Sequence, residues 1–259
     1  TILLYYNIIL LEKNCDEKYF FELKKLKAKY FDTFNNFDKY MYFLHMSGYC
    51  AEVYNNKCST EFVREHFLLS KENFDRGTIE LGKILYMDFL NHVKIAVRAN
   101  EFEWAENYIN TFKNKLSDEK ESTLKFSNGF IKYKQGNLDE ALDLLSQTNF
   151  PSFIIKIQVK LLMLQIYYEK NYFEQAIGLI DSFRHYLSRE KNFIENHRQA
   201  FYEFLRITKE LIKIKTNTAD NKSNFNLKKL KTEIDNLNFN QFGIKLWLEE
   251  QIKKLMAND

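Results

Sequence analysis

Three alanines recur at nearly constant spacing in the middle of the sequence. Ala105, Ala141 and Ala176 are separated by 36 and 35 residues. Other columns recur in step with them: Leu90, Phe126 and Leu161; Ile95, Ile131 and Ile166; Asn100, Gly136 and Asn171; Phe102, Leu138 and Phe173; Ile109, Leu145 and Ile180. A fixed period of about 20–50 residues indicates a tandem array of one structural unit. The chain is therefore expected to adopt a repeat architecture.

The columns have physical roles in a helical hairpin. Asn and Gly adopt a positive φ more easily than other residues, so Asn100, Gly136 and Asn171 are expected to end a first helix in the left-handed conformation. A second helix then begins within a residue or two, which produces an antiparallel hairpin. The small alanines allow the two helices to approach closely. Each hairpin leaves an apolar side that a neighbouring hairpin can cover, so the units are expected to stack.

A low content of glycine and proline extends the helical prediction to the whole chain. Seven glycines and one proline in 259 residues cannot supply the tight turns of sandwiches, barrels or doubly wound sheets. A hydrophobic fraction of 45% is enough for a packed core. We therefore expect an all-α protein with about 13 helices and no strand.

The segment from Tyr133 to Leu142, YKQGNLDEAL, resembles the central signature of the tetratricopeptide repeat. The likeness includes Gly129 and Phe130 upstream, and Tyr167 and Tyr168 before the third alanine. It extends over residues 85–188, with Val93 and Leu164 standing where Gly129 matches the small residue of the family. The resemblance implies an α-solenoid, in which hairpins stack into a right-handed superhelix.

Outside this block the repeat pattern is degenerate. We predict degenerate N-terminal hairpins at 1–78, three repeats at 79–190, and C-terminal capping helices at 191–259 with a polar loop at 216–224. Within the first segment, Phe37, Tyr40, Met41 and Leu44 have helical spacing and mark one helix of a further hairpin. All three segments are expected to form one continuous solenoid domain.

The resemblance also implies where a ligand would bind. In tetratricopeptide-repeat proteins the first helix of each repeat lines a concave groove, whose ligands are usually peptides or partner proteins. The matching columns place Lys94, Arg98, Phe130, Tyr133, Lys134, Gln165, Tyr168 and Glu169 in this groove. Aromatic rings would hold partner side chains there, while cations and amides would reach carbonyls or carboxylates. The column of Leu90, Phe126 and Leu161 fits either the groove or the core between helices.

Charge and cysteine content argue against other kinds of partner. Lys and Arg total 38 against 35 Asp and Glu, a net charge of +3 with interleaved signs, whereas nucleic-acid-binding proteins concentrate cations on one face. Cys15, Cys50 and Cys58 lack the Cys-x2-Cys spacing of zinc sites and indicate a reducing compartment. No apolar run approaches the ~20 residues that span a bilayer. We expect a cytoplasmic protein without metal, cofactor, nucleic acid or membrane.

Catalytic motifs are weak. Residues 77–84 match a phosphate-binding loop except that Ile84 stands where Ser or Thr would hold magnesium. None of the five histidines belongs to a His-Glu-x-x-His motif. The expected function is therefore a non-catalytic interaction scaffold that binds a peptide or partner protein. The alternative is a sensor, regulatory or assembly arm of a larger bacterial protein, whose output region would precede Thr1.

Overall fold

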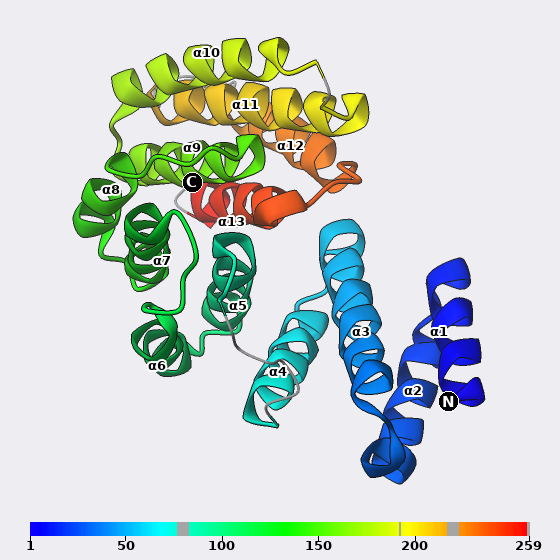
Figure 1. The fold of residues 1–259 in the computed structure, drawn as a ribbon. Helices are drawn as coiled ribbons and strands as arrows, with labels where there is room; N and C mark the ends of the chain where they lie inside the picture. The colour runs from blue at the N-terminus through cyan, green and yellow to red at the C-terminus, as the bar shows by residue number, and fades with distance from the viewer. Residues whose placement is uncertain (77–82, 192, 217–222, 258–259) are drawn as a thin grey trace. The chain divides into compact units, whose positions relative to one another are not determined.

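The computed structural model describes residues 1–76, 83–191, 193–216 and 223–257. This part of the chain contains thirteen α-helices, two short 3₁₀ helices and no strand (Figure 1). The α-helices are α1 (Ile2–Asn14), α2 (Glu17–Tyr30), α3 (Asn36–Lys57), α4 (Glu61–Asp75), α5 (Tyr86–Arg98), α6 (Phe102–Phe112), α7 (Lys120–Lys134), α8 (Leu138–Ser146), α9 (Phe153–Glu169), α10 (Phe173–Arg189), α11 (Glu195–Thr216), α12 (Ser223–Asp235) and α13 (Ile244–Ala257). The all-α prediction and the expected helix number are confirmed. Residues 77–82 of the phosphate-loop match and 217–222 of the polar loop lie outside the described residues.

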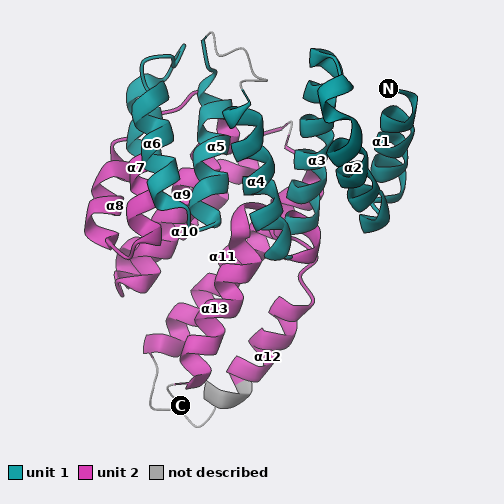
Figure 2. Cartoon of the chain, turned by 90° about the horizontal axis from the view of Figure 1, so that it is seen from below, with its two compact units in different colours: residues 1–54, 59–127 teal, residues 55–58, 128–259 magenta. Residues whose placement is uncertain are grey.

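The chain forms two compact units, which are coloured separately in Figure 2. Unit 1 consists of Thr1–Tyr54 and Ser59–Ser127, and unit 2 of Asn55–Cys58 and Asn128–Asp259. Within unit 1, α1 packs on α2, α4 on α5, and α5 on α6. Within unit 2, α8 packs on α9, α9 on α10, α10 on α11, and α11 on both α12 and α13. Helices that follow one another in the chain are therefore mostly neighbours in space.

Aromatic rings join the helices of unit 1. Phe20 of α2 lies 5.3 Å from Tyr49 of α3 and 5.3 Å from Phe62 of α4, measured between ring centroids. Phe20 is completely buried, and Tyr49 and Phe62 are almost so. Edge-to-face and offset contacts of this kind add to the gain from burying the rings. The N-terminal helices therefore share one core.

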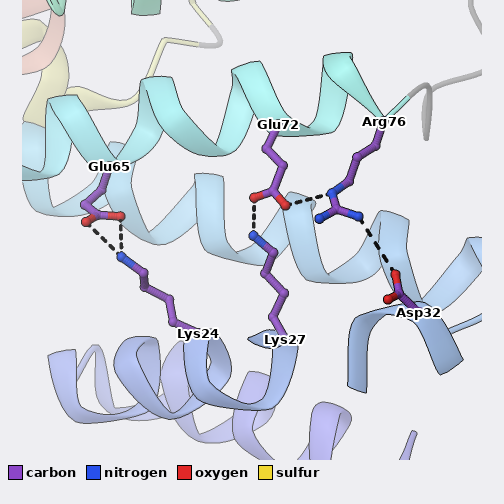
Figure 3. Close-up of polar contacts among 6 residues, drawn as sticks. All are labelled: Lys24, Lys27, Asp32, Glu65, Glu72 and Arg76. Atoms are coloured by element: carbon purple, nitrogen blue, oxygen red, sulfur yellow. Dashed lines mark hydrogen bonds and ion pairs between the residues drawn. The ribbon is translucent and has the colours of Figure 1, made fainter. Parts of the chain in front are cut away.

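Ion pairs connect α2 to α4 along the edge of this core (Figure 3). The Lys24 ammonium donates to both carboxylate oxygens of Glu65, at 2.9 and 2.8 Å. Glu72 accepts from Lys27 and also from Arg76, whose Nε lies 2.8 Å away. These side chains are partly shielded from solvent, so their attraction is screened less than that of fully exposed pairs.

The first helices of the three central hairpins end in the same backbone geometry. Asn100, Gly136 and Asn171 have φ values of 60°, 82° and 59°. Each stop residue donates its N–H to the carbonyl three residues back, at 3.1, 3.0 and 3.2 Å. The next residue donates to the carbonyl five residues back, at 2.9, 2.9 and 2.8 Å. This is the Schellman arrangement, so the predicted left-handed stops are confirmed in all three hairpins.

The second helices also begin at equivalent positions. α6, α8 and α10 start at Phe102, Leu138 and Phe173, three residues before the alanine of each repeat. Ala105, Ala141 and Ala176 are completely buried. In unit 2 the approach of α7 to α8 is close, because a Cβ added to Gly129 would lie 3.1 Å from Leu145 Cγ. The hairpins are therefore equivalent in their turns and buried alanines.

Candidate functional site

The eight residues that the resemblance assigns to a groove occupy three helices. Lys94 and Arg98 lie on α5 in unit 1, and the other six lie on α7 and α9 in unit 2. Most of these side chains are buried within the fold, namely those of Lys94, Phe130, Tyr133, Gln165 and Tyr168. Arg98 and Glu169 are half-buried, and Lys134 is exposed. We call the set on α7 and α9 (Phe130, Tyr133, Lys134, Gln165, Tyr168 and Glu169) the first-helix face of unit 2.

The Glu169 carboxylate is the polar centre of this face. The Tyr133 hydroxyl donates to Glu169 Oε1 at 2.9 Å. Trp247 of α13 donates its indole Nε1–H to the same oxygen at 2.8 Å. Hydrogen bonds to a charged acceptor are roughly twice as strong as those between neutral groups. The last helix of the chain is thus bound to the first-helix face through its indole.

Aromatic contacts surround this hydrogen bond. The Trp247 ring lies edge-on to Tyr168, with a centroid distance of 5.3 Å and an interplanar angle of 77°. Phe204 of α11 contacts the same indole at 5.8 Å. The Lys215 ammonium lies 4.6 Å from the centroid of the Tyr168 ring and donates to Asn171 Oδ1 at 2.7 Å. Trp247 therefore has the features of an interface anchor, a large buried ring with a satisfied polar atom.

Burial and charge keep Tyr133 protonated. Burial raises the pKa of this phenol well above its ordinary value, and the negative charge of Glu169 raises it further. The hydroxyl consequently remains a donor throughout the physiological pH range. Burial has the opposite effect on Lys215, whose pKa is lowered, although the charge of Glu169 partly offsets that change.

The two predicted residues of unit 1 lie in a cationic environment. Burial lowers the pKa of Lys94 to about 7, and the charge of Arg98 acts in the same direction. Arg98 lies one helical turn from Lys94 and places its guanidinium 5.1 Å from the centre of the Tyr54 ring. Burial, followed by the charge of Arg98, also lowers the pKa of His66 to about 4. Both pKa shifts therefore favour the uncharged forms of His66 and Lys94.

Sequence reasoning missed Trp247 and Lys215. Trp247 is one of two tryptophans in the chain, and the repeat alignment does not reach α13. Its contact with Glu169 joins residues 78 positions apart. A rare large aromatic residue on an amphipathic final helix was the available signal, but it does not identify the surface that the ring contacts.

Within the described ranges, no group of three or more His, Cys, Asp and Glu side chains is arranged to hold a metal ion. Nor does any described helix combine the length and apolar character needed to cross a membrane. Compared with protein-family models, curated proteins and solved structures, the sequence matches none.

Proposed function

We propose that this chain is a non-catalytic interaction scaffold, similar to tetratricopeptide-repeat proteins, that binds a helical segment of a partner protein. The binding surface is the first-helix face of unit 2. The equivalent turns of the three hairpins support a helical-repeat architecture, which commonly provides extended binding surfaces. The observation that carries the proposal is the bond from Trp247 to Glu169, by which α13, a helix that also packs on α11 and α12, contacts this face.

The contacts of α13 indicate the chemistry of such a partner. An indole or similar donor would reach Glu169, while its ring would pack against Tyr168. Helix-in-groove recognition uses anchors spaced along one side of an amphipathic helix. Ile244, Trp247, Leu248, Gln251 and Ile252 are buried positions of α13 with this spacing, of which Trp247 contacts the first-helix face, and α13 also packs on α11 and α12. The partner would replace α13, so its apparent affinity depends on the fraction of molecules in which α13 is released.

A peptide made from α13 tests this proposal. The probe is a fluorescein-labelled synthetic peptide of residues 244–257, and its binding is followed by fluorescence anisotropy. The wild-type chain is expected to bind it weakly, because the face is already occupied. Trp247→Ala removes the anchor from the tethered helix and should strengthen binding of the wild-type peptide at least tenfold. Hydrogen exchange should show faster exchange in α13 and retained protection in α9 and α10.

Two matched controls test whether binding depends on the indole and on Glu169. A peptide that itself carries Trp247→Ala should not bind, and adding Glu169→Gln to the protein variant should weaken binding of the wild-type peptide. If the Trp247→Ala protein releases α13, stays folded and still does not bind the peptide, the proposed binding surface is wrong. Equal binding of both peptides would show that the contact is not specific to the indole.

A further inference from the structure

An exposed apolar surface lies on α1 and α3 in unit 1. Six large side chains contribute to it, with exposed fractions of 87% for Ile2, 60% for Tyr6, 59% for Ile9, 64% for Phe37, 51% for Tyr40 and 49% for Leu44. We call this set the α1/α3 face. Single exposed apolar residues are normal on a protein surface, but a contiguous patch of this kind marks an interaction site.

Polar contacts align the two helices. The Tyr5 hydroxyl donates to Asp38 Oδ1 at 2.9 Å, and His45 Nδ1 lies 2.6 Å from the Glu12 carboxylate. Both contacts join residues 33 positions apart, so α1 and α3 run side by side in the same direction. With this offset, Ile2, Tyr6 and Ile9 lie within one or two residues of the levels of Phe37, Tyr40 and Leu44. The six side chains therefore form three rows of two.

Both apolar stripes point away from the core that the helices share. On α1 the buried residues are Leu4, Ile8 and Leu11, about 160° around the helix from the centre of the exposed stripe at ~100° per residue. On α3 the same separation holds between the exposed stripe and the buried positions, which include Tyr42, Met46 and Val53. On each helix, the side chains that contact the other helix lie between the buried residues and the exposed stripe. The two exposed stripes therefore lie on the same side of the helix pair.

The α1/α3 face is large enough for a stable interface. With roughly 200 Å² for a fully exposed large side chain, the six exposed fractions correspond to about 700 Å². The largest apolar patch on a typical monomer is about 300–600 Å². A standard protein–protein interface buries about 800 Å² on each partner. The exposed area, which includes the tyrosine hydroxyls, is therefore comparable to the largest patches of monomers and approaches what one half of a dimer requires.

The charge pattern favours a second copy of this chain as the partner that covers the α1/α3 face. The three rows contain no charged side chain, and Asp38 beside them is buried and accepts from both Thr1 and Tyr5. A two-fold axis sets a surface against itself, so an uncharged patch carries no like-charge penalty. Exposed Lys13 continues the stripe one turn beyond Ile9. An antiparallel arrangement keeps the two copies of Lys13 at opposite ends, whereas a parallel one would bring them together.

We propose that the chain forms a two-fold symmetric homodimer, in which the α1/α3 faces of two copies pack antiparallel against each other. Tyr6 and Tyr40 form the middle row and lie nearest the axis, where they meet the middle row of the second copy. This assembly is independent of helix binding on the first-helix face of unit 2, because the two use different residues.

Charge exchange in the middle row tests the dimer directly. Sedimentation equilibrium of the full chain should give twice the monomer mass, with a dissociation constant that is micromolar or tighter. Tyr6→Glu with Tyr40→Glu, and separately Tyr6→Lys with Tyr40→Lys, should each raise that constant at least 100-fold. An equimolar mixture of the two double variants should recover the dimer mass, because each carboxylate now faces an ammonium.

The substituted side chains are already solvent-exposed, so the variants should retain wild-type circular dichroism. Ile194→Glu is the matched control, since this side chain is 61% exposed in unit 2 and outside the patch. It should leave the dimer unchanged. A wild-type chain that remains monomeric at about 100 µM overturns the proposal. So does a dimer that both double variants preserve, or a monomer that instead binds lipid vesicles through these residues.

Discussion

Replacing Gly136 by alanine should destabilise the protein, even though alanine favours helices. Gly136 has a φ of 82°, and no atom lies within 4 Å of the position that a new Cβ would occupy. The effect is therefore conformational and not steric. The left-handed region costs an ordinary L-residue roughly 1–2 kcal/mol. Restricting the unfolded chain returns about 0.4–1 kcal/mol. The free energy of unfolding should fall by about 1 kcal/mol.

The same substitution at Gly178 should have the opposite sign. Gly178 lies inside α10 without a positive φ, and its new Cβ would also meet nothing within 4 Å. Alanine there should stabilise the protein by about 0.5–1 kcal/mol, because glycine is less favourable inside a helix. The two variants add the same methyl group, so they differ in backbone conformation alone.

Urea unfolding followed by circular dichroism at 222 nm measures both effects. The midpoint should fall for Gly136→Ala and rise for Gly178→Ala, with a gap of roughly 1.5–2 kcal/mol between them. In thermal unfolding each kcal/mol corresponds to about 2–4 °C for a chain of this size. A Gly136→Ala protein as stable as the wild type would refute the argument that the turn requires a left-handed residue.

Three further substitutions examine polar contacts. Glu72→Gln should lower the free energy of urea unfolding by about 1 kcal/mol, because the carboxylate holds two partly shielded cations; no change would show that solvent screens these pairs. Folding lowers the Lys94 pKa to about 7, so between pH 7 and 9 the unfolded chain binds this proton more tightly than the folded chain does. The free energy of unfolding should therefore rise over this range, by at most ~1.4 kcal/mol per pH unit. Lys94→Met should reduce this increase of the unfolding free energy with pH in urea titrations. If the pH dependence is unchanged, other groups cause it. Tyr133→Phe should lower the free energy of urea unfolding by about 1–3 kcal/mol, because it removes a donor to Glu169. Tyr172→Phe, which changes a 40% exposed side chain, should have no effect. Equal effects of the two substitutions would contradict the importance of the Tyr133–Glu169 bond.

Local features of the fold were predictable because neighbouring residues determine them. Asn100, Gly136 and Asn171 could be assigned to helix stops since few residues adopt a positive φ easily. The buried alanines followed from the same alignment, because only a small side chain suits a close helix approach. The stacking of all hairpins into one solenoid, by contrast, stays a prediction.

The use of each helix face could not be predicted from spacing. Tyr133 and Tyr168 match groove columns of a known family, but here they are buried and contact Trp247 or its acceptor. Phe37 and Tyr40 have the spacing of a packed helix face and are exposed. Periodicity shows that residues share a face, but it does not show what covers that face. That information comes from contacts between distant parts of the chain.

The short turns within the three hairpins have a consequence for proteolysis. Three residues separate α5 from α6, α7 from α8, and α9 from α10, and their amides are held in the Schellman bonds. Proteases cut preferentially at exposed loop tips, and such tight turns provide no extended backbone for a protease to bind. Of the longer connections, 113–119 is tied to Ile84, which donates its N–H to the Lys115 carbonyl and accepts from the Ser117 N–H, whereas 147–152 lacks such a backbone pairing among the described residues. Limited digestion should therefore cut first at 147–152, and an affinity tag is best inserted there.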